Sequence, residues 1–124
     1  MDTKLKDRTM LQKCSNPKQE KLQNIFKLYD MGQFHDVLVQ IDETIKLFPN
    51  SDVLYTIRGA TNAALGQFNI AADNYKSAIK INPNNAGAHN NMGNNLKAQG
   101  KLEVSIKSYK EAIRIFPKYA PPKR

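Results

Sequence analysis

The sequence predicts an all-α fold, a solenoid built from three helical hairpins with about six helices. The prediction rests on a repeat of 34 residues that runs through the chain without insertion. Glycines, prolines and isoleucines recur at this step: Gly32, Gly66 and Gly100; Pro49, Pro83 and Pro117; Ile45, Ile79 and Ile113. A fixed period of this length is typical of helical hairpins that stack on one another. The predicted repeats are residues 18–51, 52–85 and 86–119, within one domain that spans 17–119.

The first hairpin is predicted to begin at Pro17, because proline is tolerated at the start of a helix and disfavours helix in the residue before it. Its first helix carries four apolar residues on one face: Leu22, Ile25, Phe26 and Tyr29. A turn at Gly32 ends that helix, and a second amphipathic helix starts at Phe34. Residues 1–16 lack such a face and are predicted to form a flexible N-terminal tail.

The second and third hairpins follow the same plan, with turns at Gly66 and Gly100. Small residues recur at matching places in their second helices: Ala71, Ala78, Ser105 and Ala112. Small side chains let neighbouring helices approach closely, and the larger apolar residues fill the space between them. Pro121 and Pro122 prevent a further helix, so residues 120–124 are predicted to form a short C-terminal tail.

Composition limits the range of functions. The chain has 19 Lys and Arg against 11 Asp and Glu, a formal charge of +8, and most of the excess lies in residues 86–124. Cys14 is the only cysteine, so the chain offers neither an internal disulfide nor a cysteine cluster for a metal. No stretch is apolar enough for a signal peptide or a membrane span. We expect a cytoplasmic protein without a cofactor and without membrane insertion.

The last two repeats carry small, aromatic and proline residues at a characteristic spacing. In the third repeat these are Gly93, Ser105, Tyr109, Ala112 and Pro117. The second has Tyr55, Gly59, Ala71, Tyr75, Ala78 and Pro83. This pattern resembles the tetratricopeptide repeat (TPR). The first repeat is degenerate, and only Gly32, Phe34 and Pro49 keep it in phase. The resemblance covers residues 17 to about 119 and implies a right-handed α-solenoid.

The resemblance also implies a function, because the first helices of such a solenoid line a concave face that holds segments of other proteins. The family positions that face this groove carry over to the following residues: Leu22, Phe26 and Tyr29; Val53, Thr56, Ala60 and Ala63; Asn90, Asn91, Asn94 and Lys97. The groove is therefore expected to be apolar at one end and rich in asparagine at the other. The resemblance favours a protein-interaction module or scaffold that binds an extended peptide.

Each end of the predicted groove has an alternative interpretation. The asparagine run 89–95 is similar to the asparagine-bearing helices of O-linked N-acetylglucosamine transferases and bacterial TPR proteins, where the amides contact bound polypeptide. Asparagine can both donate to and accept from a peptide backbone, but these side chains could also be merely solvated. Leu22, Phe26 and Tyr29 could belong to the core, although their stripe lies one residue later than the family's packing positions.

Two more specific activities are disfavoured. TPR co-chaperones bind a terminal carboxylate with basic and amide side chains, whereas the matching positions here are Leu22, Phe26, Ile57, Gly87 and Asn91. Four of these five lack the required chemistry. Catalysis is not expected either, because His35 and His89 have no nucleophile or carboxylate partner at a readable spacing.

Two surface features suggest other partners. Lys107, Lys110, Arg114 and Lys118 step by 3, 4 and 4 residues, which predicts a cationic stripe along the last helix. It could serve an acidic protein or simply be a solvated face, and nucleic acid is disfavoured because no aromatics are interleaved for base stacking. The outer side of the last helix carries Leu102, Ile106, Tyr109 and Ile113, and no capping helix follows. We expect this end either to mediate self-association or to be the surface that the next repeat covers in a longer TPR relative.

Overall fold

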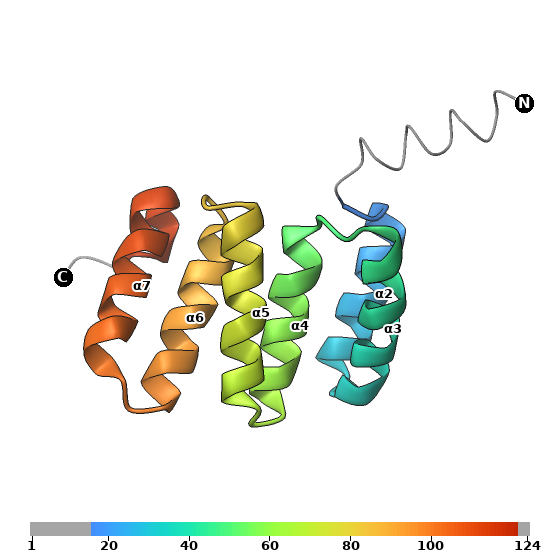
Figure 1. Ribbon diagram of the computed structural model, residues 1–124, viewed down its shortest axis with the longest axis horizontal. Coiled ribbons are helices and arrows are strands. Elements are labelled where there is room, and N and C mark those ends of the chain that lie inside the picture. Colours follow the sequence, from blue (N-terminus) through green and yellow to red (C-terminus); the bar gives the residue numbers. More distant parts are fainter. Residues whose placement is uncertain (1–15, 122–124) are drawn as a thin grey trace, which may run out of the picture.

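The computed structural model describes residues 16–121, in which six α-helices follow one another and a short 3₁₀ helix, η1, comes last (Figure 1). The predicted flexible tail lies outside the described residues except for Asn16, as do residues 122–124 of the predicted C-terminal tail. The elements are α2 (Gln19–Asp30), α3 (Phe34–Leu47), α4 (Asp52–Ala64), α5 (Phe68–Ile81), α6 (Ala86–Ala98), α7 (Leu102–Ile115) and η1 (Pro117–Tyr119). The predicted all-α fold of three helical hairpins is confirmed.

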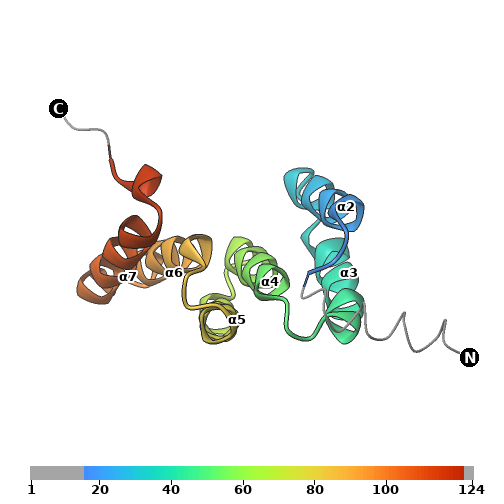
Figure 2. The same ribbon diagram turned by 90° about the horizontal axis from the view of Figure 1, so that it is seen from above.

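The hairpins stand side by side in a row from α2 and α3 at one end to α7 at the other (Figure 1). Seen from above, α2, α4 and α6 lie along one side of the row and α3, α5 and α7 along the other (Figure 2). The first helices of the second and third repeats also contact the second helix of the preceding repeat: α4 packs on α3, and α6 packs on α5. Among the described residues, none of the helices has the length and apolar character required to cross a bilayer.

The predicted glycine turns close all three hairpins. Gly32, Gly66 and Gly100 have φ angles of 75°, 78° and 77°, a region that only glycine enters without strain. The residue after each glycine donates its backbone N–H to a carbonyl five residues earlier, for example Gln67 to Asn62 at 2.8 Å. These bonds satisfy carbonyls that the end of a helix leaves unpaired.

Glycine has a second role inside the helices of the last two hairpins. A Cβ atom at Gly59 would lie 2.5 Å from the Tyr75 ring, and one at Gly93 would lie 2.6 Å from the Tyr109 ring. The rings therefore rest directly on the backbone of α4 and α6. The first repeat has Ile25 at the corresponding position, and its helices α2 and α3 consequently touch less closely than the other two pairs.

Two apolar clusters form the core. The first lies between α2, α3 and α4 and consists of Leu22, Ile25, Val37, Ile41, Leu54 and Ile57. The second joins α5 to α6 through Ala71, Tyr75, Met92 and Leu96. Burial in the second cluster raises the pKa of the Tyr75 hydroxyl well above its usual range, so the ring stays neutral.

Polar side chains tie one repeat to the next. Ser51 caps α4 by accepting from the Leu54 N–H at 3.2 Å, and its hydroxyl donates to Asn16 at 2.6 Å. Asn85 caps α6 by accepting from the Ala88 N–H at 2.9 Å, while its amide nitrogen donates to Asp52 of the preceding repeat at 2.9 Å. These bonds satisfy backbone groups at the starts of helices and fix the spacing between hairpins.

The C-terminal end differs in part from the prediction. Leu102 and Ile106 are 58% and 52% exposed, as expected for an uncapped helix, but Tyr109 and Ile113 are half-buried. Tyr109 is held by its contact with Gly93. The chain then turns back at η1, whose Tyr119 hydroxyl approaches Gly87 at the start of α6.

Candidate functional site

Two adjoining depressions run along the side formed by α2, α4 and α6. The larger has a volume of about 470 Å³ and is lined by Phe26, Tyr29, Asp30, Val53, Thr56, Ile57, Ala60, Asn85 and Asn91. The smaller has a volume of about 290 Å³ and is lined by Tyr29, Ala60, Ala63, Ala64, Phe68, Tyr75, Asn91, Asn94 and Asn95. Tyr29, Ala60 and Asn91 border both, so we treat the two as one feature, the inner groove.

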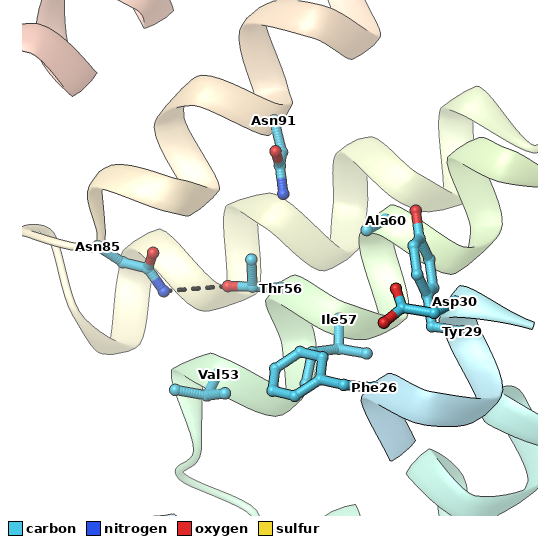
Figure 3. A pocket seen from close by; sticks show the side chains of 9 residues that line it. All are labelled: Phe26, Tyr29, Asp30, Val53, Thr56, Ile57, Ala60, Asn85 and Asn91. Carbon is cyan, nitrogen blue, oxygen red and sulfur yellow. Dashed lines mark hydrogen bonds between the residues drawn. The ribbon is translucent and has the colours of Figure 1, made fainter. Parts of the chain in front are cut away.

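The apolar part of the inner groove comes from α2 and α4. Phe26 is 43% exposed and lies opposite Val53 and Ile57 (Figure 3). The Tyr29 ring packs edge-on against Phe34, with the ring centroids 5.2 Å apart, which holds it at the junction of the two depressions. Because α4 contributes Ala60 and not a larger residue where the two depressions meet, the groove stays open at that point.

The placement of Leu22 in the groove is wrong. Its side chain is 8% exposed and packs in the first core cluster with Ile25 and Val37. The apolar stripe of α2 is wide enough to serve two surfaces, so Leu22 and Ile25 face the core while Phe26 and Tyr29 face the groove. The one-residue shift of this stripe relative to the family's packing positions explains why part of it faces the groove and not the core.

Asparagines of α6 supply the polar part of the groove, in three different ways. Asn91 borders both depressions, and its side chain makes no hydrogen bond within residues 16–121, so its side-chain amide is free for a ligand (Figure 3). The side-chain oxygen of Asn94 accepts from the Tyr109 hydroxyl. Asn95 is 2% exposed and donates to the Phe68 carbonyl at 3.0 Å, while its Oδ1 has no partner among the described residues.

Thr56 lines the groove, but its hydroxyl already has internal partners. It donates to the Asp52 carbonyl at 2.8 Å and accepts from the Asn85 amide at 3.0 Å (Figure 3). Asn85 uses its remaining N–H on Asp52 and its oxygen on the α6 cap. Both residues therefore position α4 against α6 and have little capacity left for a ligand.

Besides Leu22, two predicted groove residues border neither depression. Asn90 is half-buried and Lys97 is exposed, and both lie on α6. The α2 side of the groove is lined by Phe26, Tyr29 and Asp30, and the α6 side by the N-cap residue Asn85 and by Asn91, Asn94 and Asn95.

Asp30 lines the inner groove but was not among the predicted groove residues. It is the last residue of α2, it is exposed, and it lines the larger depression beside Tyr29 (Figure 3). A signal for it existed, because Asp30 occupies the repeat position of Ala64 and Ala98, at the end of each first helix. The contributions of Phe68 and Tyr75 to the smaller depression depend on how α5 packs, which no periodicity reveals.

The predicted cationic stripe is shorter than expected. Lys107, Lys110 and Arg114 are exposed on α7, but the helix ends at Ile115 and Lys118 lies in η1, with its ammonium 5.9 Å from the centre of the Phe116 ring. Pro117 cannot continue the helix, and this breaks the register. Arg114 is paired with Glu111 at 2.6 Å. The described part of the chain contains no cluster of three or more histidine, cysteine, aspartate and glutamate residues suited to a metal.

The fold and the inner groove together define a class of protein, a helical-hairpin repeat solenoid with a concave surface on its first helices. A family model described as TPR repeat matches residues 59–100, and one described as tetratricopeptide repeat matches residues 86–119. No curated protein matches the chain significantly over its sequence.

Solved structures of TPR domains superpose on most of the chain. The first TPR of Spaghetti (RPAP3) bound to the HSP90 peptide SRMEEVD aligns with TM-score 0.74 and 22% identity, over 77% of this chain and 77% of that one. The Arabidopsis OM64 TPR domain aligns with TM-score 0.73 and 20% identity, over 76% and 78%.

The Yersinia enterocolitica secretion chaperone SycD, in complex with a peptide of the translocator YopD, aligns with TM-score 0.72 and 16% identity, over 78% of this chain and 74% of that one. At such low identity these likenesses show the shared fold. With the family matches, they establish that the chain belongs to the tetratricopeptide-repeat family.

Proposed function

We propose that the protein is an interaction module or scaffold whose inner groove holds an extended segment of another protein. The observation that carries this proposal is Asn91, an unbonded amide at the centre of a groove with an apolar floor. An extended peptide presents unpaired backbone N–H and C=O groups, and one asparagine amide can both donate to and accept from them. The apolar floor formed by Phe26, Val53 and Ile57 can bury side chains of the ligand.

The comparisons support a peptide partner at the level of the fold. Two TPR structures with similar chain paths carry peptides, one from HSP90 and one from the translocator YopD. Neither peptide identifies the ligand of this chain, because the likeness concerns the fold and not the residues that line the groove.

A peptide selection combined with two groove variants tests the proposal. Peptides selected from a phage-displayed random dodecapeptide library on the wild-type protein should bind less well to Asn91→Ala, by about two- to tenfold for one hydrogen bond. Ala60→Arg should abolish binding because it fills the groove where the two depressions meet. Asn24→Ala is the matched control, because this exposed asparagine of α2 lies outside the inner groove and its side chain has no hydrogen bond within residues 16–121, so the variant should bind as the wild type does.

Melting curves show whether a variant loses binding only because it is no longer folded. Within residues 16–121 the Asn91 side chain has no hydrogen bond, and alanine is the better helix former, so Asn91→Ala should melt at or slightly above the wild-type temperature. If the Asn91 and Ala60 variants bound the selected peptides as well as the wild type, the groove would not be the binding site.

Self-association through α7 is a second proposal, favoured by the exposed Leu102 and Ile106. One repeat earlier the corresponding residues, Phe68 and Ala72, are partly buried at the junction of α5 and α6. The α7 surface therefore has the shape that a further first helix would cover. Sedimentation equilibrium at high concentration should show an oligomer that Ile106→Lys dissociates, whereas a strict monomer would contradict this proposal.

The cationic residues of α7 give weaker support to a third proposal, in which the protein is an adaptor for acidic partners. Arg114 is already paired with Glu111, and Lys118 is off the helix. Binding through Lys107 and Lys110 would fall steeply with salt, and a flat salt dependence would exclude it.

A further inference from the structure

We propose that the inner groove selects segments in which an arginine lies next to apolar side chains, and that Asp30 is the residue that recognises the arginine. This inference rests on the proposed function, since it specifies the peptide that the groove would hold. It begins with the charges of the groove. Asp30 is the one charged residue among those that line the two depressions.

The Asp30 carboxylate has no partner of its own in the described part of the chain. The ion pairs there join Arg58 to Asp42 and Arg114 to Glu111, and no hydrogen bond is made to the Asp30 carboxylate. Lys27, the basic residue in the last turn of α2, lines a different depression between α2 and α3. A cation from a ligand could therefore pair with Asp30 without displacing an internal partner.

The position of Asp30 in the fold also favours a ligand cation. The C-terminal end of a helix carries a partial negative charge, so a carboxylate in the last residue of α2 is electrostatically unfavourable. The repeat does not require it, because the corresponding residues of α4 and α6 are Ala64 and Ala98. A charge that the fold neither needs nor neutralises, set at the edge of an apolar groove, is complementary to a basic partner.

The neighbouring rings make arginine the best-fitting cation. Figure 3 shows the Asp30 carboxylate beside the Tyr29 ring, with Phe26 further along the same groove. A guanidinium group is planar, so it can stack on an aromatic ring while its N–H groups pair with a carboxylate. Its apolar neighbours in the peptide would then reach Val53 and Ile57. An acidic residue at the same place would meet Asp30 with no base to neutralise it.

Reversal of the charge at Asp30 tests this inference directly. The random dodecapeptide library is selected in parallel on the wild type, on Asp30→Lys and on the control Asp73→Lys, which changes an exposed aspartate of α5. Peptides from the wild type and from the control should be enriched in arginine beside apolar residues. Peptides from Asp30→Lys should be enriched in aspartate or glutamate, because the groove then carries the opposite charge.

The size of the Asp30 effect is measured as the change in affinity for one peptide that was selected on the wild-type protein. Asp30→Asn should weaken it by about two- to fivefold, as for an exposed ion pair, and Asp30→Lys by at least about tenfold. Peptides that lose binding in Ala60→Arg but lack basic residues, or that bind Asp30→Lys equally well, would overturn the arginine preference and leave the proposed function standing. Failure to select any groove-binding peptide would overturn both.

Discussion

Replacing Gly59 by alanine tests how the hairpins are built. Alanine is a better helix former than glycine by about 1 kcal/mol, so on propensity alone the substitution should stabilise α4. The structure predicts the opposite, because the added Cβ would lie 2.5 Å from Cε1 and 2.7 Å from Cδ1 of Tyr75. Tyr75 is 1% exposed and cannot move aside without disturbing the second core cluster.

The expected magnitude follows from these opposing terms. Overpacking of a core costs about 1–3 kcal/mol. A contact of 2.5 Å with a buried ring places this substitution toward the upper end of that range, about 2–3 kcal/mol, so after the gain of about 1 kcal/mol in helix propensity the net loss should be about 1–2 kcal/mol. For a domain of this size, such a loss lowers the melting temperature by about 5–15 °C, which thermal unfolding followed by circular dichroism at 222 nm can measure. Gly93→Ala should cost less, because Tyr109 is only half-buried and can adjust.

Two controls separate the contact from a general effect of alanine. Gly87→Ala adds a Cβ with ordinary contacts, the nearest being 3.4 Å from Asn85, so it should leave stability unchanged or raise it slightly. Tyr75→Leu combined with Gly59→Ala should be less destabilising than the sum of the two single changes, because the clashing ring is absent. A Gly59→Ala protein as stable as the wild type would refute this account of helix packing.

Other predictions concern single contacts. Asn95→Ala should lower the free energy of unfolding by about 1–2 kcal/mol in chemical denaturation, because it removes the buried bond to the Phe68 carbonyl. Ser51→Ala should cost about 1 kcal/mol by the same assay, since it removes the cap of α4. The hydrogen bond from Arg114 lowers the pKa of Glu111, so their pairing is complete above the unfolded-chain pKa and is lost as the pH falls through the folded one. In Arg114→Gln, the Glu111 titration followed by NMR should return toward its ordinary value.

The sequence predicted the hairpins because their signals are local or strictly periodic. Each turn needs a glycine with positive φ, and Gly32, Gly66 and Gly100 mark all three turns at a constant step. Small residues at Ala71 and Ser105 indicated where helices pack closely, and both side chains are buried. These features depend on a few neighbours along the chain, so they can be read without coordinates.

The groove could be predicted only in outline. The choice between core and groove for Leu22, Phe26 and Tyr29 depends on the rotation of α2 about its axis, which follows from how Ile25 separates α2 from α3. The commitment of Thr56 to internal hydrogen bonds depends on Asn85, 29 residues away along the chain. The shifted phase of the α2 stripe indicated that part of it could leave the core but not which residues do so, whereas the bond between Thr56 and Asn85 leaves no trace in local periodicity. That the Asp30 carboxylate has no partner within residues 16–121 is likewise visible only in three dimensions.

Chemical-shift mapping is the most direct test of the central claim that the inner groove binds an extended peptide. A ¹⁵N-labelled protein is titrated with a peptide selected from the random library. The account predicts that backbone signals of α2, α4 and α6 shift, together with the side-chain amide of Asn91 and the backbone amide of Asp30. Shifts confined to α7, at Lys107 and Ile106, with α2 and α4 unaffected, would contradict it.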